Sequence, residues 1–296
     1  MATTVADLAA TARKMWVRFE TYHAVTYFTP ESKAAVEALG CQGGWMSYFA
    51  MRAAPLGAVP PEVVTSVFYN FHPIRVGKSI PAAWELAEPR AFLAARLAGA
   101  DGSLRRLLGE DVVAGAELAE AAELAVRAAA AAPTAGRVLG TANSILPTPD
   151  APHLALWQAA TTLRESRGDG HVAALVSADL DACETLVLYG ADRGLDSAFL
   201  KVARRWSDEE WQEATDRLAD RGLVTPDGVI TDGGTELRRW IEDRTDEAAV
   251  APWREIGEAG SERLLELWGA LALRIATGND AMRTNPMGLD AVRELS

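Results

Sequence analysis

The chain has 296 residues, of which 49% are hydrophobic and 24% charged, and its formal net charge is −12. This length and apolar content suffice for one large helical domain or two domains of ordinary size, and they exclude a disordered chain. The acidic balance disfavours nucleic acid and anionic membranes as partners, because nonspecific affinity for phosphates comes from lysine and arginine.

No segment predicts export, a membrane span or a disulfide framework. The opening residues, MATTVADLAATARK, have no basic region followed by an apolar core, so we expect a cytoplasmic protein. The alanine-rich run 112–132 is interrupted by three glutamates and an arginine at helical spacing, which excludes a span. Cys41 and Cys183 match no metal or redox spacing and are expected to be buried free thiols.

The first half of the chain predicts helices only. Apolar and aromatic residues recur every three or four positions from Val5 to Phe28, which places them on one helix face. Thr29 and Pro30 provide an N-cap and a first-turn proline for a second helix, which stops at Gly40. Further helices are predicted at 45–52, from 60, from 81, at 89–108 and at 112–132.

The proline-rich segment 145–152 is the clearest break in the chain. It predicts a division into a helical domain, residues 1–147, and a winged-helix domain, residues 148–296. After the break, helices are predicted at 153–166, 170–178, 180–190, 196–205 and 207–222, and in two pieces between 235 and 276. The predicted fold class is therefore mainly α.

The 207–222 helix and the residues after it have the order of the third helix and wing of a winged helix-turn-helix module. Ser207 and Glu210 form a capping-box pattern. A short β-hairpin is predicted from residues 223–225 and 229–231, which flank a Pro-Asp-Gly turn. The helix that reads DNA in such modules here has six acidic residues and two arginines, a net charge of −4.

A distant internal similarity links residues 186–211 to residues 67–84. In both segments an aromatic helix end containing tyrosine is followed by a later helix that begins just before a tryptophan. The similarity indicates a tandem winged-helix-like arrangement.

Three of the four histidines are candidates for chemistry or metal binding, namely His23, His72 and His171. Imidazole is the natural acid and base near neutral pH and the commonest metal ligand. Because no two of them are four residues apart, a shared site depends on the fold. His23 is either a ligand-facing residue or a core histidine, whereas His153, in a proline-rich loop, is expected to be exposed.

Residues 167–171, RGDGH, place two glycines around an aspartate. One interpretation is that the glycines allow a tight turn that points Asp169 and His171 the same way, so that the carboxylate orients the imidazole. The other is that Gly168 ends one helix and Asp169 caps the next.

Aromatic residues concentrate between positions 45 and 71, beside basic residues. Apolar walls with a few polar anchors describe a small-molecule pocket, and an aromatic core is the alternative. The predicted ligand-binding residues are Tyr27, Trp45, Tyr48, Phe49, Arg52, Phe68, His72 and Arg167. No nucleotide-binding, serine-hydrolase or zincin motif is present.

Five segments together resemble the SalK-like helix-turn-helix family of actinobacteria: HAVTYFTPE (23–31), WMSYFAMRAAPLG (45–57), FYNFHP (68–73), LWQAATTLRESRGDGHVAAL (156–175) and RRWSDEEWQEATDRLADRGLV (204–224). The resemblance covers nearly the whole chain and implies the fold rather than DNA binding. It directs attention to His23, Tyr27, Arg52, Pro55, Gly57, residues 167–171, Trp206 and Trp211. Ser166 departs from the family pattern, which has a histidine there.

These observations predict a small-molecule-binding winged-helix protein, tied to specialised metabolism, with its pocket at the domain junction. If the protein is an enzyme, His23, His171 and Asp169 are the predicted catalytic residues, and a histidine acts as acid and base or binds a metal or haem iron. The sequence leaves enzymatic activity and the cofactor open, and it is compatible with a homodimer. The alternative is a ligand-responsive transcriptional regulator.

Overall fold

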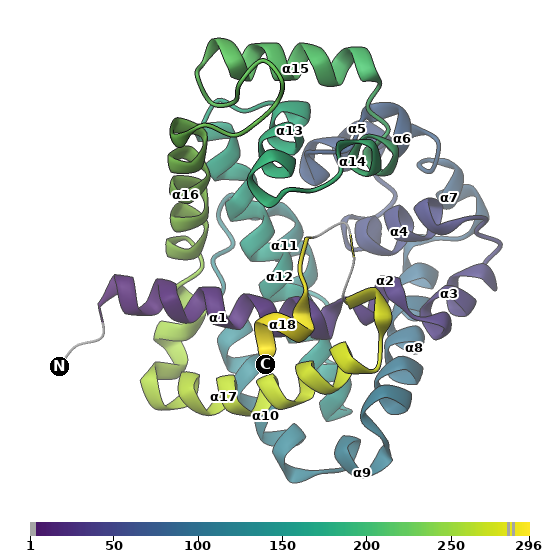
Figure 1. The fold of residues 1–296 in the computed structure, drawn as a ribbon. Helices are drawn as coiled ribbons and strands as arrows, with labels where there is room; N and C mark the ends of the chain where they lie inside the picture. The colour runs from purple at the N-terminus through teal and green to yellow at the C-terminus, as the bar shows by residue number, and fades with distance from the viewer. Residues whose placement is uncertain (1–3, 283–284, 286–287) are drawn as a thin grey trace.

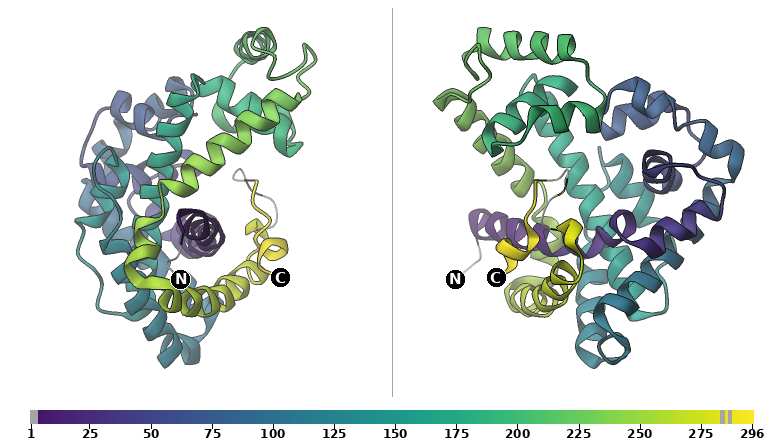
Figure 2. Two further views of the ribbon diagram at one scale, coloured as in Figure 1. Left: turned by 90° about the vertical axis from the view of Figure 1, so that its left-hand side faces the viewer. Right: turned by 45° about the vertical axis from the view of Figure 1, so that its right-hand side comes forward.

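Helix α1 (Val5–His23) runs through the middle of the protein, as seen in the computed structural model, which describes residues 4–282, 285 and 288–296 (Figure 1). Viewed along its axis, α1 is surrounded by other helices (Figure 2). A capping box begins it: the Thr4 hydroxyl accepts the N–H of Asp7, and the Asp7 carboxylate accepts the N–H of Thr4. The helix packs against α12, α16 and α17.

The N-terminal half is helical, as predicted, but its helices are short. After α1 the chain forms α2 (Val25–Phe28), α3 (Pro30–Glu37), α4 (Gly44–Ala53), η1 (Ala54–Leu56), α5 (Pro61–Phe68), α6 (Pro73–Gly77) and α7 (Ala82–Leu86). The single helix expected from Val5 to Phe28 is interrupted at Ala24. Thr29 is the N-cap residue of α3, but its hydroxyl donates to the Val25 carbonyl instead of capping the helix.

The next helices are α8 (Pro89–Leu108), α9 (Glu110–Val113), α10 (Ala116–Ala130) and α11 (Val138–Ser144), and both α10 and α11 pack against α12. The helix expected at 112–132 is divided because Gly115 adopts an extended conformation and begins α10. Alanine allows α10 to lie close to α12 and α17, the two helices it packs against.

Helix α12 (Pro152–Ser177) is continuous, so the prediction of separate helices at 153–166 and 170–178 is wrong. Glycine is compatible with helical geometry, and here the two glycines of RGDGH lie within the helix. The chain continues through α13 (Ala182–Arg193), α14 (Ser197–Arg204), α15 (Asp208–Asp220), α16 (Asp232–Glu247), α17 (Ala251–Thr277), η2 (Asp280–Met282) and α18 (Ala291–Leu295). The capping box predicted for Ser207 and Glu210 is confirmed at the start of α15.

The predicted β-hairpin wing is not formed, and no strand is present in the part of the chain that the structure describes. Residues 223–231 make only an isolated antiparallel bridge between Val224 and Ile230. Pairing stops there because Thr231 already begins α16, where its hydroxyl accepts the N–H of Gly234. The mainly α class is confirmed, and the turn exists without strands.

Four apolar cores hold the described helices together, the smallest of which joins α1 to the end of α17 and to α18. The largest combines α1, α8, α10, α12 and α17, and so takes residues from both sides of position 147. A second core lies among α3 to α8, and a third joins the end of α12 to α13, α15 and α16. The division of the chain at residue 147 remains a prediction. Cys41 and Cys183 are buried and free, as expected.

Within the described residues, no helix is long and apolar enough to cross a membrane.

A cavity lined by arginine

A cavity of about 250 Å³ lies where α1, α4, α12, α13 and α16 meet the segment 67–71 and the end of α14. Its aromatic lining residues are Trp16, Tyr48, Phe68, Tyr69, Phe71 and Tyr189. Its charged and histidine lining residues are Arg52, Arg164, Arg167, Arg193, Arg204, Arg238, Glu20, Glu242 and His171. Arginine therefore dominates the polar lining of a cavity in a protein whose overall charge is strongly negative.

A strained turn forms one wall of the cavity. Tyr69 has φ 60° and ψ −68°, and the N–H of Asn70 donates to the Phe68 carbonyl at 2.8 Å, which defines a γ-turn. A positive φ is costly for an aromatic residue, and such conformations cluster at functional sites. The Tyr69 hydroxyl donates to the Leu180 carbonyl and holds the turn in place.

The turn presents two phenylalanine rings to arginines. The Arg52 guanidinium lies 4.1 Å from the ring centroid of Phe68, and that of Arg204 lies 4.4 Å from the centroid of Phe71. Both distances are within the range of cation–π attraction. The segment 68–71 thus fixes the positions of two guanidinium groups on the cavity wall.

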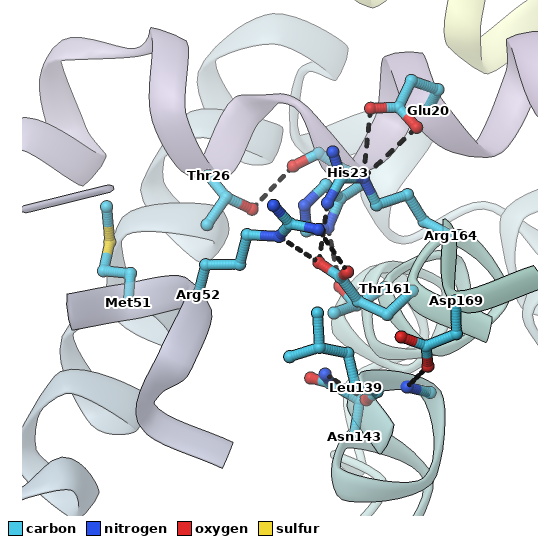
Figure 3. Close-up of polar contacts among 12 residues, drawn as sticks. Glu20, His23, Thr26, Met51, Arg52, Leu139, Asn143, Thr161, Arg164 and Asp169 are labelled. Carbon is cyan, nitrogen blue, oxygen red and sulfur yellow. Dashed lines mark hydrogen bonds and ion pairs between the residues drawn. The ribbon is translucent and has the colours of Figure 1, made fainter. Parts of the chain in front are cut away.

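A buried ion-pair network includes the lining residues Arg52, Arg164 and Glu20 (Figure 3). Glu165 is 1% exposed and accepts hydrogen bonds from Arg52 Nε and Nη2, both at 3.0 Å, and from Arg164 Nη1 at 2.7 Å. Arg164 also pairs with Glu20 on α1 at 3.2 Å. Burial raises the pKa of Glu165, but Arg164 and Arg52 lower it by more, so the pKa lies well below its ordinary value.

A second network lies on the opposite wall. Arg167 donates to Asp246 at 2.8 Å, and Arg238 donates to Glu242 at 2.7 Å. Arg13 joins the same two carboxylates from α1, at 2.7 Å to Asp246 and 2.5 Å to Glu242. The charges of Arg167 and Arg238 are therefore balanced within the protein.

His171 lines this cavity, and its hydrogen bonds determine which ring nitrogen carries the proton. Its Nδ1 lies 2.9 Å from the hydroxyl of Thr245, and that hydroxyl donates its own proton to the Ile241 carbonyl at 2.7 Å. Because a hydroxyl has a single proton, Nδ1 must be the donor and Nε2 carries a lone pair. Burial lowers the pKa of His171 to about 4, so the ring is neutral at pH 7.

His23 is a core histidine. It is 1% exposed, its Nδ1 lies 2.9 Å from the Thr161 hydroxyl, and its Nε2 has no hydrogen-bond partner among the described residues. Burial and the nearby Arg164 lower its pKa well below the ordinary value. Figure 3 shows it behind Arg52 and Arg164, and it does not line the cavity.

Asp169 does not orient His171, so the first interpretation of RGDGH is wrong. Residues two apart on a helix do not face each other. The Asp169 carboxylate instead accepts the N–H of Gly140 at 2.8 Å, in the first turn of α11 (Figure 3). The second interpretation is wrong in its detail, because Gly168 ends no helix and the helix that Asp169 caps is α11.

The three candidate histidines do not meet. His72 Nε2 lies 2.9 Å from a carboxylate oxygen of Glu210 on α15, and its ring contacts Trp206. No group of three or more His, Cys, Asp or Glu in the described ranges is arranged to hold a metal ion. His153, expected to be exposed, is 1% exposed and bonds Asp101 at 2.6 Å.

Apart from His72, the predicted ligand-binding residues separate into three groups. Tyr48, Arg52, Phe68 and Arg167 line the cavity. Trp45 and Phe49 belong to the aromatic core of the N-terminal half. Tyr27 contacts Tyr48 with ring centroids 4.9 Å apart and lines a separate cavity of about 300 Å³ between α2, α3 and α4.

Several cavity residues carried no recognisable signal in the sequence. Arg164, Arg204, Arg238 and Glu242 are isolated charged residues on helices, and ordinary surface positions have the same appearance. A pattern of charged residues that fall on the apolar face of a helix would have identified them, since buried charges are rare unless paired.

Helices α13, α14 and α15, where the sequence predicts the helix-turn-helix module, pack together beside the cavity, and α13 and α14 contribute to its lining, so the fold and cavity together define an all-helical protein with an arginine-lined cavity. The chain belongs to a helix-turn-helix family, whose match extends over residues 12–282. This confirms the family assignment at that level. No curated protein and no solved structure matches the chain.

Proposed function

We propose that this protein binds a small molecule in the arginine-lined cavity beside helices α13, α14 and α15. The observation that carries the proposal is the cavity itself, in which aromatic walls surround a few fixed polar groups. This composition is typical of ligand sites. The strained turn at Tyr69 and the fixed lone pair of His171 support the same conclusion, since both are features of preorganised sites.

His171 is the residue proposed to meet the ligand through nitrogen. Its Nε2 can accept a hydrogen bond from a hydroxyl or amine of the ligand at neutral pH. The resemblance to SalK-like proteins supports a ligand from specialised metabolism.

Gly168 provides the test of the cavity. It lines the cavity on α12, and a Cβ added there would meet no atom within 4 Å. Gly168→Leu places a side chain in the cavity while keeping a good helix former on the helix. Ligand-observed NMR with a fragment library should identify binders of the natural protein whose signals are lost with Gly168→Leu. Equal binding of every fragment to both proteins would remove the proposal.

The second candidate function is a ligand-responsive transcriptional regulator, which the helix-turn-helix family and the cavity's position beside α13–α15 favour. Electrostatics oppose it, since Asp208, Glu209, Glu213, Asp216 and Asp220 are exposed on α15. Arg217 pairs with Asp181 and Glu184, so it is not free for phosphate. A mobility-shift assay with DNA from upstream of its own gene, at low salt, tests this function. A complex that weakens steeply with salt would support it, and the absence of a complex would exclude it.

A further inference from the structure

Two arginines that line the cavity, Arg193 and Arg204, have no ion pair among the described residues; Arg193 is exposed to solvent, whereas Arg204 is partly buried. Arg52, Arg164, Arg167 and Arg238 each form an ion pair with a carboxylate. Arg204, at the end of α14, forms none with any described residue. Its Nε donates to the side-chain oxygen of Asn70 at 3.2 Å, and its guanidinium lies over Phe71.

The Arg204 side chain donates a hydrogen bond to a described residue only through Nε, so its terminal nitrogens, Nη1 and Nη2, have no partner in the described part of the chain. Burial lowers the pKa of Arg204, and the nearby Arg52 and Arg75 act in the same direction. A partly buried cation next to other cations is costly unless an anion joins it. Asn70 and Phe71 nevertheless hold this group in one position.

We propose that the ligand of the cavity is an aromatic or similarly apolar molecule with one carboxylate, and that the Nη1 and Nη2 fork of Arg204 binds the carboxylate. Arginine binds carboxylates through two parallel hydrogen bonds, which suits a fork whose Nε is already engaged. Arg204 is the one lining arginine without an ion pair among the described residues that is withdrawn from solvent, since Arg193 is exposed, and this matches a single negative charge on the ligand. The apolar body of the ligand lies against Tyr48, Phe68 and Phe71.

This inference rests on the proposed function. Its test uses two probes of the same shape, 2-naphthoate and its neutral amide, 2-naphthamide, with Kd values measured by NMR titration. The natural protein is expected to bind 2-naphthoate with a Kd about tenfold lower, as a charge-assisted bidentate pair predicts. Arg204→Gln should remove this preference. Arg205→Gln, a change at the exposed neighbour outside the cavity, should retain it.

Each outcome decides one claim. Equal Kd values for the two probes in the natural protein, or a preference that survives Arg204→Gln, would overturn the assignment of the anion to Arg204. Tighter binding of 2-naphthyl phosphate than of 2-naphthoate would overturn the single-charge class. If the probes bind Gly168→Leu and the natural protein with equal Kd values, they lie outside the cavity, and the proposed function fails too.

Folding of the variant is checked by circular dichroism and urea unfolding. Gln can retain the hydrogen bond to Asn70, so Arg204→Gln is expected to fold. Arg204→Lys gives an independent measurement, because it keeps the charge and loses the fork. It should reduce the preference for 2-naphthoate to about threefold, and an unchanged tenfold preference would contradict the fork geometry.

Discussion

His23 and His171 are held in the same tautomer by the same arrangement. Each donates its Nδ1 proton to a threonine hydroxyl, and each threonine donates its own proton to the carbonyl four residues earlier in its helix. The two histidines differ in the environment of Nε2. That of His23 is buried without a described partner, whereas His171 lines the cavity. One geometry therefore produces a core histidine and a ligand-facing histidine.

In the Thr245→Val variant, the ring of His171 should no longer be restricted to the tautomer that has its proton on Nδ1. Valine has nearly the shape of threonine but cannot accept the Nδ1 proton, so a buried donor is left unsatisfied, at a cost of about 1–3 kcal/mol in the free energy of unfolding. In the natural protein, ¹⁵N-detected imidazole spectra at pH 7 should show protonated Nδ1 and unprotonated Nε2. A mixture of tautomers in the natural protein would contradict this assignment, and Thr235→Val on the same helix controls for helix effects.

Asp169→Asn should change how stability depends on pH. Burial raises the pKa of Asp169 from 3.8 to about 6. A carboxyl group whose pKa is raised on folding stabilises the protein below the unfolded pKa, and this contribution is lost as pH rises through the folded pKa. Asparagine can still accept the Gly140 N–H and has no charge to bury, so the variant should gain about 1–2 kcal/mol relative to the natural protein between pH 4 and pH 7. Urea unfolding at pH 4 and pH 7 measures the difference in the free energy of unfolding between the two proteins. A difference that is the same at both pH values would contradict the raised pKa of Asp169.

Glu165→Gln should be strongly destabilising. The change leaves Arg52 without its carboxylate in a buried position and removes one of two carboxylates from Arg164, which costs about 3 kcal/mol or more. Glu120→Gln is a matched control, because Glu120 also accepts two hydrogen bonds from one arginine, Arg263, but at the surface. We expect chemical denaturation to show a large decrease in the free energy of unfolding for Glu165→Gln and little change for Glu120→Gln. Similar losses in both would show that burial is not the cause.

Gly168→Ala and Gly140→Ala should have opposite effects. Both glycines are helical, but a Cβ at Gly168 meets no atom within 4 Å, while one at Gly140 lies 2.7 Å from the Cα of Ser166. The first change should stabilise the protein by about 0.5–1 kcal/mol through helix propensity. The second should destabilise it by about 1–3 kcal/mol, because the backbones of α11 and α12 must separate. Thermal unfolding of the two variants gives the comparison, and a shift in the same direction would contradict the packing of α11 on α12.

Local sequence signals determined much of the helical structure. The capping box at Ser207 and Glu210, the proline at the start of α3 and the apolar spacing from Val5 onward each act within one or two turns, so they can be read from neighbouring residues. The predicted β-hairpin wing is wrong because strand pairing depends on where the next helix begins. Thr231 is the N-cap residue of α16, so the second strand cannot extend past it.

Tertiary structure alone decided the candidate site. Of the predicted catalytic residues, only His171 lines the cavity, because the position of a helix face is set by packing across the whole chain. Glu165 binds Arg52, 113 residues away in the sequence, and Arg164, its direct neighbour. No sequence motif indicates this arrangement, because ion pairs between helices follow no fixed spacing. The terminal nitrogens of Arg204 can be recognised as unpaired only when the partners of Arg52, Arg164, Arg167 and Arg238 are known, and those pairs require the fold.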